Sequence, residues 1–347
     1  MTSHPEYKEK TTATEVARAF SDQIRNKNVV ITGVAPNSLG EAIALAIASQ
    51  NQSKLILASR TKEKVEQVIT KIKGSFPNVS AEFVELDLAS QKSVERAASS
   101  IAAQLDTIDV LINNAGVVVQ EHRFTEENIE LQFGTNHIGH FLLTNLLLDR
   151  IRNAARKPGS VPGATRIVNV TSAGHRLSPI RFHDYNFTAE GGGTESLPPE
   201  EQPPAGLPDM FSPGSRGYNG WLAYGQSKTA NVLFSVYLTH RLKDAGIVSY
   251  SVHPGSIWTG LSRHLDERGT ETISKTGSFW KSTDQGAAPM LVAAFDPALN
   301  EPSEPSKTYL HECQLAEAAP HAVNLEAAER LFRLSEELVG RKFDLSS

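Results

Sequence analysis

Short apolar segments alternate with longer segments of helical composition along most of this chain of 347 residues. The apolar segments have the length and the β-branched content of buried strands. Two parallel strands can be joined only by a crossover of roughly ten or more residues, whereas antiparallel strands need only a tight turn. The alternation therefore predicts a doubly wound parallel sheet, a Rossmann fold with three α/β/α layers. The expected strands are residues 28–33, 54–60, 80–88, 108–116, 165–172 and 247–255.

One large domain is expected, preceded by a short N-terminal piece. Residues 1–26 predict a tail, disordered over about the first twelve residues, followed by a short helix with apolar side chains at helical spacing. Residues 27–347 then form a single domain. Its sequence is interrupted over 179–219 by a stretch rich in Pro and Gly, which cannot supply a core of its own and predicts an irregular surface excursion. Residues 260–347 form a C-terminal region on the substrate side.

Charge and composition exclude several classes of function. The net charge is −5, from 34 basic and 39 acidic residues without a basic block, so nucleic acid is not an expected partner. The single cysteine, Cys313, excludes an internal disulfide and leaves no thiol cluster for a metal; a packed thiol is favoured over a catalytic one. No apolar run approaches the ~18 residues that span a bilayer, and the N-terminus lacks an apolar h-region, so a secretory signal is not expected. A soluble, cytoplasmic protein is expected, with a homo-oligomer left open.

Tyr224 and Lys228 are the strongest chemical signal. They stand four residues apart in a predicted helix, so both side chains share one face. A nearby ammonium favours the phenolate and lowers a pKa that is about 10 when unperturbed. Tyr224 would then exchange protons near neutrality. Ser172 ends a predicted strand upstream, where it could bind a substrate or simply cap a turn.

The first predicted strand ends in a glycine turn that leads into a helix. Free amide groups and the helix dipole make such a turn an anion site, although Gly33 and Gly40 alone could belong to a simple tight connection. Arg60 follows the second strand, where an acidic residue would bind the ribose of NAD; an arginine suits a 2′-phosphate, so NADP(H) is the expected cofactor. Lys64 adds charge nearby. Asp87 could accept a hydrogen bond from the adenine amine or cap the next helix.

Taken together, the motifs resemble the short-chain dehydrogenase/reductase superfamily. Beside the Thr32–Gly33 turn, the chain contains NNAG at 113–116, FGTNHIGHF around Asn136, VNVTSAG around Ser172, YGQSK at 224–228 and HPGSIWT at 253–259. These motifs occur in the family order over about residues 27–265. The resemblance is greatest to the retinol-dehydrogenase-like branch and its fungal relatives.

The resemblance implies a role for each matching residue. Tyr224 would be the acid/base, Lys228 would lower its pKa and hold the nicotinamide ribose, Ser172 would bind the reacting carbonyl oxygen, and Asn136 would anchor a water that relays protons to Lys228. Cofactor contacts are expected from Gly33, Asn37, Ser38, Leu39, Gly40, Ser59, Arg60, Lys64, Asp87, Leu88, Asn114, Ala115, Gly116, Tyr224, Lys228, Pro254, Gly255, Ile257 and Thr259.

Two departures from the family pattern concern the turn and the excursion. The glycine turn is one residue longer than usual and has Ser38 where a glycine is common. The gap between Ser172 and Tyr224 is far longer than in compact members, which places the excursion over the substrate mouth. Aromatic residues could line an apolar pocket or pack in the core. They are Phe182, Tyr185, Phe187, Phe211, Tyr218, Trp221 and Trp258.

The expected function is an NADP(H)-dependent oxidoreductase that interconverts an alcohol and a ketone or aldehyde, on a small lipophilic or secondary-metabolite substrate. The alternative is a catalytically silent protein of the same fold that binds NADP(H) as a regulatory signal, since a fold does not by itself confer activity.

Overall fold

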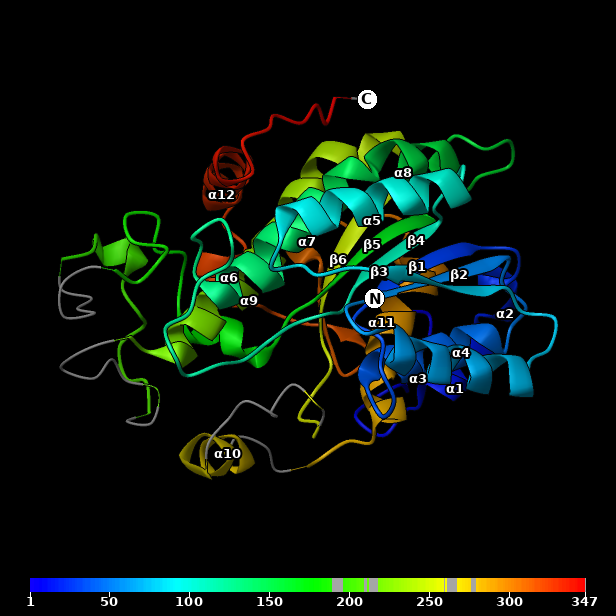
Figure 1. Cartoon of the computed structure of the whole chain (residues 1–347), viewed down its shortest axis with the longest axis horizontal. Helices are drawn as coiled ribbons and strands as arrows, with labels where there is room; N and C mark the ends of the chain where they lie inside the picture. Colours follow the sequence, from blue (N-terminus) through cyan, green and yellow to red (C-terminus); the bar gives the residue numbers. More distant parts are fainter. Residues whose placement is uncertain are drawn as a thin grey trace.

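The computed structural model describes residues 1–188, 196–208, 211, 218–258, 260, 267–275 and 279–346. Its strands form an eight-stranded sheet in the order β3-β2-β1-β4-β5-β6-β7-β8 (Figure 1). All neighbours pair in parallel except β7 and β8, which pair antiparallel. The chain builds outward from β1 to β3 and then returns to the other side of β1, which confirms the predicted doubly wound sheet. The strands are β1 (Asn28–Thr32), β2 (Lys54–Ser59), β3 (Ala81–Glu85), β4 (Val110–Asn113), β5 (Thr165–Val170), β6 (Ile247–His253), β7 (Tyr309–His311) and β8 (Gln314–Leu315).

Helices cover both faces of the sheet (Figure 1). Successive strand residues point to opposite faces, so Val29 and Ile31 of β1 join one apolar cluster while Val30 joins the other. One face packs against α1 (Ala13–Ala19), α3 (Leu39–Ala48), α4 (Lys62–Ser75) and α11 (Thr283–Phe295). The other packs against α5 (Gln91–Gln104), α7 (Gly139–Leu146), α8 (Leu148–Ala155) and α9 (Gly220–Leu242), with α12 (Leu325–Leu338) outside α9. The shorter helices are α2 (Ser21–Ile24), α6 (Leu131–Phe133) and α10 (Glu267–Ser274).

The six predicted strands are all present, but β7 and β8 were not predicted. They are only three and two residues long, too short for an alternation pattern to stand out. Leu310 of β7 is nevertheless fully buried beside β6. The pairing partner, rather than the local sequence, makes this segment a strand.

Residues 126–151, whose apolar spacing predicts one long helix, do not form a continuous one. The structure breaks it into α6, a π-helical turn at Gly134–Ile138, α7 and α8. A π-turn inserts one extra residue into a helix and is common at functional sites. This one contains Asn136, a residue that the sequence places in the site.

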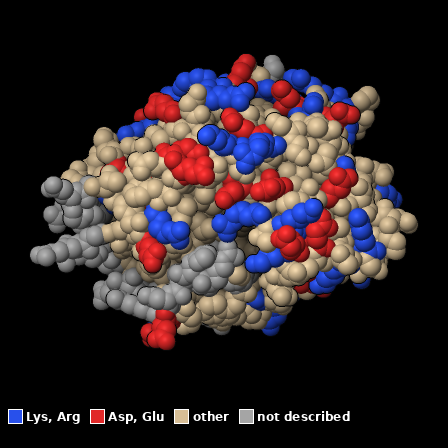
Figure 2. Space-filling model, viewed as in Figure 1, with Lys and Arg blue, Asp and Glu red and all other residues tan. Residues whose placement is uncertain are grey.

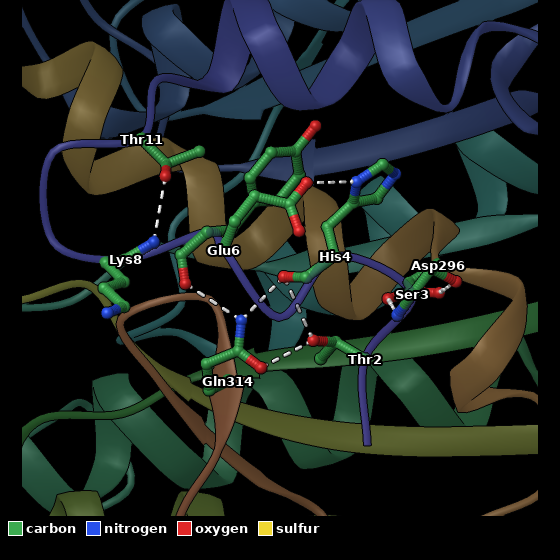
Figure 3. A network of polar contacts seen from close by, with 9 residues as sticks. Thr2, Ser3, His4, Glu6, Lys8, Thr11, Asp296 and Gln314 are labelled. Atoms are coloured by element: carbon green, nitrogen blue, oxygen red, sulfur yellow. Dashed lines mark hydrogen bonds and ion pairs between the residues drawn. The ribbon is translucent and has the colours of Figure 1, made fainter.

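The first twelve residues, expected to be disordered, are held against the domain (Figure 3). The Ser3 amide and hydroxyl both donate to the buried carboxylate of Asp296, the amide at 2.8 Å. The Gln314 side-chain amide donates to the carbonyl oxygens of His4 and Tyr7, at 2.9 Å each. These partners lie about 300 positions further along the chain, so no local pattern could have revealed them. The short helix predicted to follow is present as α1.

The described parts of the 179–219 excursion pack both on the domain and on one another, as where His183 Nδ1 lies 2.8 Å from the Glu201 carboxylate. Phe187 packs against Leu222 and Ala223 of α9. The buried carboxylate of Glu201 forms an ion pair of 3.2 Å with Arg330 of α12. Both contacts attach the described parts of this stretch to helices that follow it in the chain.

Charged side chains of both signs are intermixed over the face shown in Figure 2. No helix among the described residues has the length and apolar content needed to cross a bilayer. Cys313 is buried in the core, and burial raises the pKa of its thiol to about 12. It is therefore a packed thiol, as the sequence favoured.

Asp296 gives a test of the N-terminal attachment. Replacement of Asp296 by Ala leaves the donors of Ser3 and Ala298 without their buried acceptor. We expect a loss of about 2–3 kcal/mol in the free energy of unfolding, measured by urea denaturation. Asp284→Ala is the matched control, because the hydrogen bonds of Asp284 to Thr14 are exposed and should contribute less than about 1 kcal/mol. Equal losses in the two variants would contradict this account.

Candidate active site

A cleft of about 1040 Å³ lies where the carboxyl ends of β1, β2, β4, β5 and β6 meet the start of α9. Most of the residues that the sequence placed in the site line it. They are Gly33, Ser38, Leu39, Ser59, Arg60, Lys64, Asp87, Leu88, Asn114, Ala115, Gly116, Ser172, Tyr224, Lys228, Pro254, Gly255 and Ile257. Parallel strands bring their carboxyl ends to one edge, which is why residues so far apart in sequence share one cleft.

Three predicted residues do not line the cleft, and one lies outside the described residues. Asn37 and Gly40 belong to the turn and to the start of α3 without lining the cleft, and Asn136 lies beneath Gly116. Thr259 lies outside the described residues.

The glycine turn is tightly packed. Gly33 has a φ of +76°, and a Cβ there would lie 2.6 Å from the Cα of Ala115. A Cβ on Gly40 would lie 2.6 Å from the carbonyl oxygen of Gly33. Both positions therefore need glycine, because β1, β4 and α3 approach each other here at backbone distance.

The extra length of this turn is accommodated without a middle glycine. Asn37 adopts a φ of +59°, a left-handed conformation that asparagine tolerates better than most residues. Ser38 is the N-cap of α3, and its hydroxyl oxygen accepts from the amide of Glu41 at 3.2 Å. The two residues that depart from the family pattern thus form a regular helix start, with its free amides directed at the cleft.

Tyr224 lies in the first turns of α9 with its ring against Gly174. A Cβ on Gly174 would approach the ring at 3.0 Å, so glycine leaves room for the tyrosine. Burial raises the pKa of Tyr224 to about 12, and a hydrogen bond with the Ser172 side chain acts in the opposite direction. At neutral pH the phenol is therefore protonated and linked to Ser172.

The prediction that Lys228 lowers the pKa of Tyr224 is wrong for this structure. The Lys228 ammonium lies 5.6 Å from the centre of the Tyr224 ring and donates to the carbonyl oxygen of Val170 at 3.2 Å. Burial lowers the pKa of Lys228 to about 8. Loss of solvation thus dominates for both groups, and the pKa of each is shifted toward its neutral form.

A buried hydrogen-bond chain connects the glycine turn with the π-turn. The Thr32 hydroxyl accepts from the amides of Asn114 and Ala115, at 2.9 and 3.0 Å. It lies 2.9 Å from His140 Nε2, and His140 Nδ1 lies 3.1 Å from the carbonyl oxygen of Asn136. A carbonyl can only accept, so His140 carries its proton on Nδ1. Its Nε2 therefore accepts a hydrogen bond from the Thr32 hydroxyl. This role of His140 was not predicted, although its position four residues after Asn136 on a helix was a usable signal.

Asn136 extends this series of hydrogen bonds to α9. Its side chain exchanges two hydrogen bonds with the backbone of Val117, accepting at 2.8 Å and donating at 3.0 Å. It also donates to the Ser227 hydroxyl at 2.9 Å, and Ser227 donates to the carbonyl oxygen of Tyr224 at 2.7 Å. Asn136 thus fixes the loop after β4 and the segment that carries Tyr224 and Lys228.

His175 performs a similar task at Ser172. Its Nδ1 donates to the carbonyl oxygen of Ser172 at 2.6 Å, and its Nε2 accepts from the amide of Ala319 at 3.0 Å. The C-terminal region is thereby tied to the strand end that carries Ser172. No sequence pattern joined these residues, because Ala319 comes from another part of the chain.

The far end of the cleft is positively charged. Arg60 and Lys64 both line it with exposed side chains. Asp87 also lines it, and its carboxylate accepts from the amide of Ala89 at 3.0 Å. The α5 N-cap is Ser90, so Asp87 does not cap that helix. This end of the cleft thus combines two cations with an acceptor.

Aromatic side chains line the cleft, but only two of those predicted take part, and these two pack beside Tyr224. Phe211 and Trp221 line the cleft, together with the unpredicted Phe279 and Trp280. Trp258 is 44% exposed and stacks on Trp280. The remaining predicted aromatics pack elsewhere: Phe182 lies under Arg330, Tyr185 on Phe133, and Phe187 against Arg181 and Tyr218.

Comparison with protein families supports this geometry. Residues 27–188 match the family described as short chain dehydrogenase. Retinol dehydrogenase 13 of Homo sapiens is 35% identical over 322 residues, which cover 91% of this chain and 86% of that protein. The oxidoreductase fscI of Fusarium equiseti is 36% identical over 250 residues, covering 72% of this chain and 94% of that protein.

Solved structures share the fold. An uncharacterized protein from Mycobacterium paratuberculosis is 30% identical, with a TM-score of 0.64 over 92% of this chain and 96% of its own. An NADPH-bound carbonyl reductase from chicken fatty liver has a TM-score of 0.55 at 19% identity, over 85% of this chain and 100% of its own. At that identity the likeness concerns the fold alone.

The two site histidines predict a loss of stability in acid. Burial lowers the pKa of both His140 and His175 from 6.5 to about 4, and protonation of either Nε2 would oppose the hydrogen bond that it accepts. Because these pKa values are lower in the folded state, stability is intact above pH 6.5 and falls as the pH drops toward 4. In urea denaturation at pH 5 to 6, each histidine should contribute a slope of about 1.4 kcal/mol per pH unit.

His140→Gln should reduce the slope of the free energy of unfolding against pH by the contribution of one histidine. It should also lower stability at pH 7. The control is His240→Gln, on the exposed side of α9, which should leave the slope unchanged. A slope in His140→Gln equal to that of the unmodified protein would show that His140 does not stay neutral in the fold.

Proposed function

Because this chain belongs to the short-chain dehydrogenase family, in the branch of the retinol dehydrogenases, we propose that it is an NADP(H)-dependent oxidoreductase that interconverts an alcohol and a ketone or aldehyde. The observation that carries the proposal is a protonated, buried Tyr224 linked to Ser172 in a cleft that also contains Lys228. A buried phenol and hydroxyl aimed at one place are suited to bind and protonate a carbonyl oxygen.

The cleft fits a dinucleotide along its length. Gly33 and Gly116 keep the floor free of side chains: a Cβ on Gly116 would lie 3.4 Å from the Lys228 ammonium. The free amides at the start of α3 suit a pyrophosphate. Arg60 and Lys64 at the far end suit a 2′-phosphate, which supports NADP(H) over NAD(H).

In the reducing direction, the bound cofactor would supply the hydride. The Ser172 hydroxyl donates a hydrogen bond to the substrate carbonyl oxygen and holds it beside Tyr224. Tyr224 gives its proton to that oxygen as negative charge develops there. Since burial keeps the pKa of Tyr224 at about 12, the proton is present throughout the neutral range.

Lys228 and Asn136 organise this exchange. The Lys228 ammonium, beside Gly116, is placed to donate to a ribose hydroxyl. Asn136 holds the loop after β4 and, through Ser227, the backbone of Tyr224. In this proposal Asn136 acts through those neighbours, in addition to any water that it anchors.

The substrate proposed is an apolar carbonyl compound or alcohol. Phe211 and Trp221 pack beside Tyr224, and Phe279 and Trp280 line the same cleft, which favours a bulky lipophilic group. Phe211 comes from the excursion before α9, which supports a role for that segment in covering the substrate.

Tyr224→Phe tests the acid/base assignment. The variant removes one oxygen atom, so we expect at least about a 100-fold loss of kcat in NADPH-dependent carbonyl reduction and an NADPH affinity within about twofold. Tyr250→Phe is the matched control: its hydroxyl is also buried, but donates to Leu299 away from the cleft, at 2.8 Å. This control should lose stability and keep its turnover rate.

Turnover retained in Tyr224→Phe would overturn the assignment. If the unmodified protein instead bound NADPH and oxidised none of it with a broad panel of aldehydes and ketones, the alternative of an NADP(H)-responsive binding protein would take its place.

Arg60→Ala tests the cofactor preference. Loss of a charged hydrogen bond to the 2′-phosphate at an exposed site should weaken NADPH binding by about tenfold and leave NADH binding unchanged. Binding is measured by titration of the cofactor's fluorescence. Arg96→Ala, on the exposed face of α5, is the control. Equal effects of Arg60→Ala on both cofactors would remove this role from Arg60.

A further inference from the structure

Lys281 is a buried lysine in the cleft to which the proposed chemistry gives no task. It precedes Ser282, the N-cap of α11, and its side chain is only 3% exposed. It nevertheless lines the same cleft as Tyr224 and the glycine turn. Burial of an ammonium costs free energy unless a partner compensates for the lost water.

The position of Lys281 is fixed by the turn after β6. Its amide donates to the carbonyl oxygen of Ser256 at 2.9 Å. Its side chain packs against Gly255, where a Cβ would lie 2.7 Å from Cε and 3.0 Å from Nζ. Gly255 has a φ of +93°, so both conformation and space require glycine there. The ammonium is thus held beside the loop at the end of β6.

The described residues around Lys281 do not neutralise it closely. The Glu312 carboxylate is 3.9 Å from Nζ, too far for a hydrogen bond, and is itself 40% exposed. Glu9 of the N-terminal segment lines the cleft and favours the charged lysine from a distance. His253 and His311 stack nearby, with ring centres 4.8 Å apart, and burial lowers the pKa of both, so they are neutral at pH 7. The site therefore contains a cation that lacks a close negative charge among the described residues, and a ligand could supply that charge.

The place of Lys281 along the cleft identifies which part of a ligand it meets. Gly286, one turn into α11, packs against Ile257 and against Leu39, the first residue of α3, with Leu39 Cδ2 2.9 Å from a Cβ built there. The start of α11, with Lys281 directly before it, therefore lies on the side of the cleft formed by α3 and the loop after β6. Lys281 is remote in the fold from Arg60 and Lys64, which follow β2 on the other side of β1.

We propose that Lys281 binds the phosphate on the nicotinamide side of the NADP(H) pyrophosphate, as a second cationic contact separate from the 2′-phosphate site. The inference rests on the proposed function, because it assumes that the cleft binds this cofactor. A compact ammonium suits a single phosphate oxygen, whereas the arginine fork suits the terminal 2′-phosphate.

Two ligands that differ at this phosphate provide the test. NADPH carries it, whereas adenosine 2′,5′-bisphosphate has the adenine-side groups and lacks it. In calorimetric titrations, Lys281→Met should weaken NADPH binding by about tenfold or more and change the Kd of the bisphosphate by less than about twofold. Methionine keeps the apolar stem that packs on Gly255, so the variant should be at least as resistant to heat as the unmodified protein. Lys307→Met, at an exposed position, is the control and should change neither Kd.

Lys281→Arg separates charge from packing. Retention of most of the NADPH affinity supports a charge contact, whereas a loss as large as in Lys281→Met would overturn it in favour of packing on Gly255. Equal loss for both ligands, or none for either, also overturns the inference. Lys281→Met could instead leave the Kd of NADPH unchanged and raise the KM only for an anionic carbonyl substrate. That result would show that Lys281 binds the substrate and not the cofactor. Failure of the unmodified protein to bind NADPH would refute the proposed function itself.

Discussion

The site depends on a chain of buried hydrogen bonds that crosses the carboxyl edge of the sheet. Thr32 at the end of β1 binds the loop after β4 and His140, and His140 binds the π-turn at Asn136. Asn136 then donates to Ser227, which lies between Tyr224 and Lys228 on α9. Each buried polar group in this series of hydrogen bonds would destabilise the fold if its partner were removed. The separate elements of the site are therefore held as one unit.

Burial has a second consequence for the titratable groups. It raises the pKa of Tyr224 and lowers those of Lys228, His140 and His175. In each case the neutral form is favoured because an interior of low dielectric solvates charge poorly. Lys281 belongs to the same pattern, as a cation in a cleft with carboxylates only at longer range. A site of this kind gains most from a ligand that brings negative charge.

Much of this arrangement could be predicted because its signals are local. The alternation of strands and helices predicts a doubly wound parallel sheet and its strands up to β6, and the spacing of Tyr224 and Lys228 predicts a shared helix face. Residues at strand ends, such as Ser172 and Arg60, follow from the same pattern, since the carboxyl ends of parallel strands meet at one edge. The break in the helix at Asn136 could not be predicted, because a π-turn leaves the apolar pattern of its helix nearly intact.

The sequence by itself determined the fold class, the family and the residues at the cleft, because periodicity and short motifs are properties of neighbouring positions. Only the tertiary structure decided the protonation states, since they follow from how deeply each group is buried. It also decided the attachment of the N-terminal segment to Asp296, the hold of His175 on Ser172, and the place of Lys281 beside Gly255. These contacts join segments that are distant along the chain, and such partners are chosen by packing, which leaves no mark on local sequence.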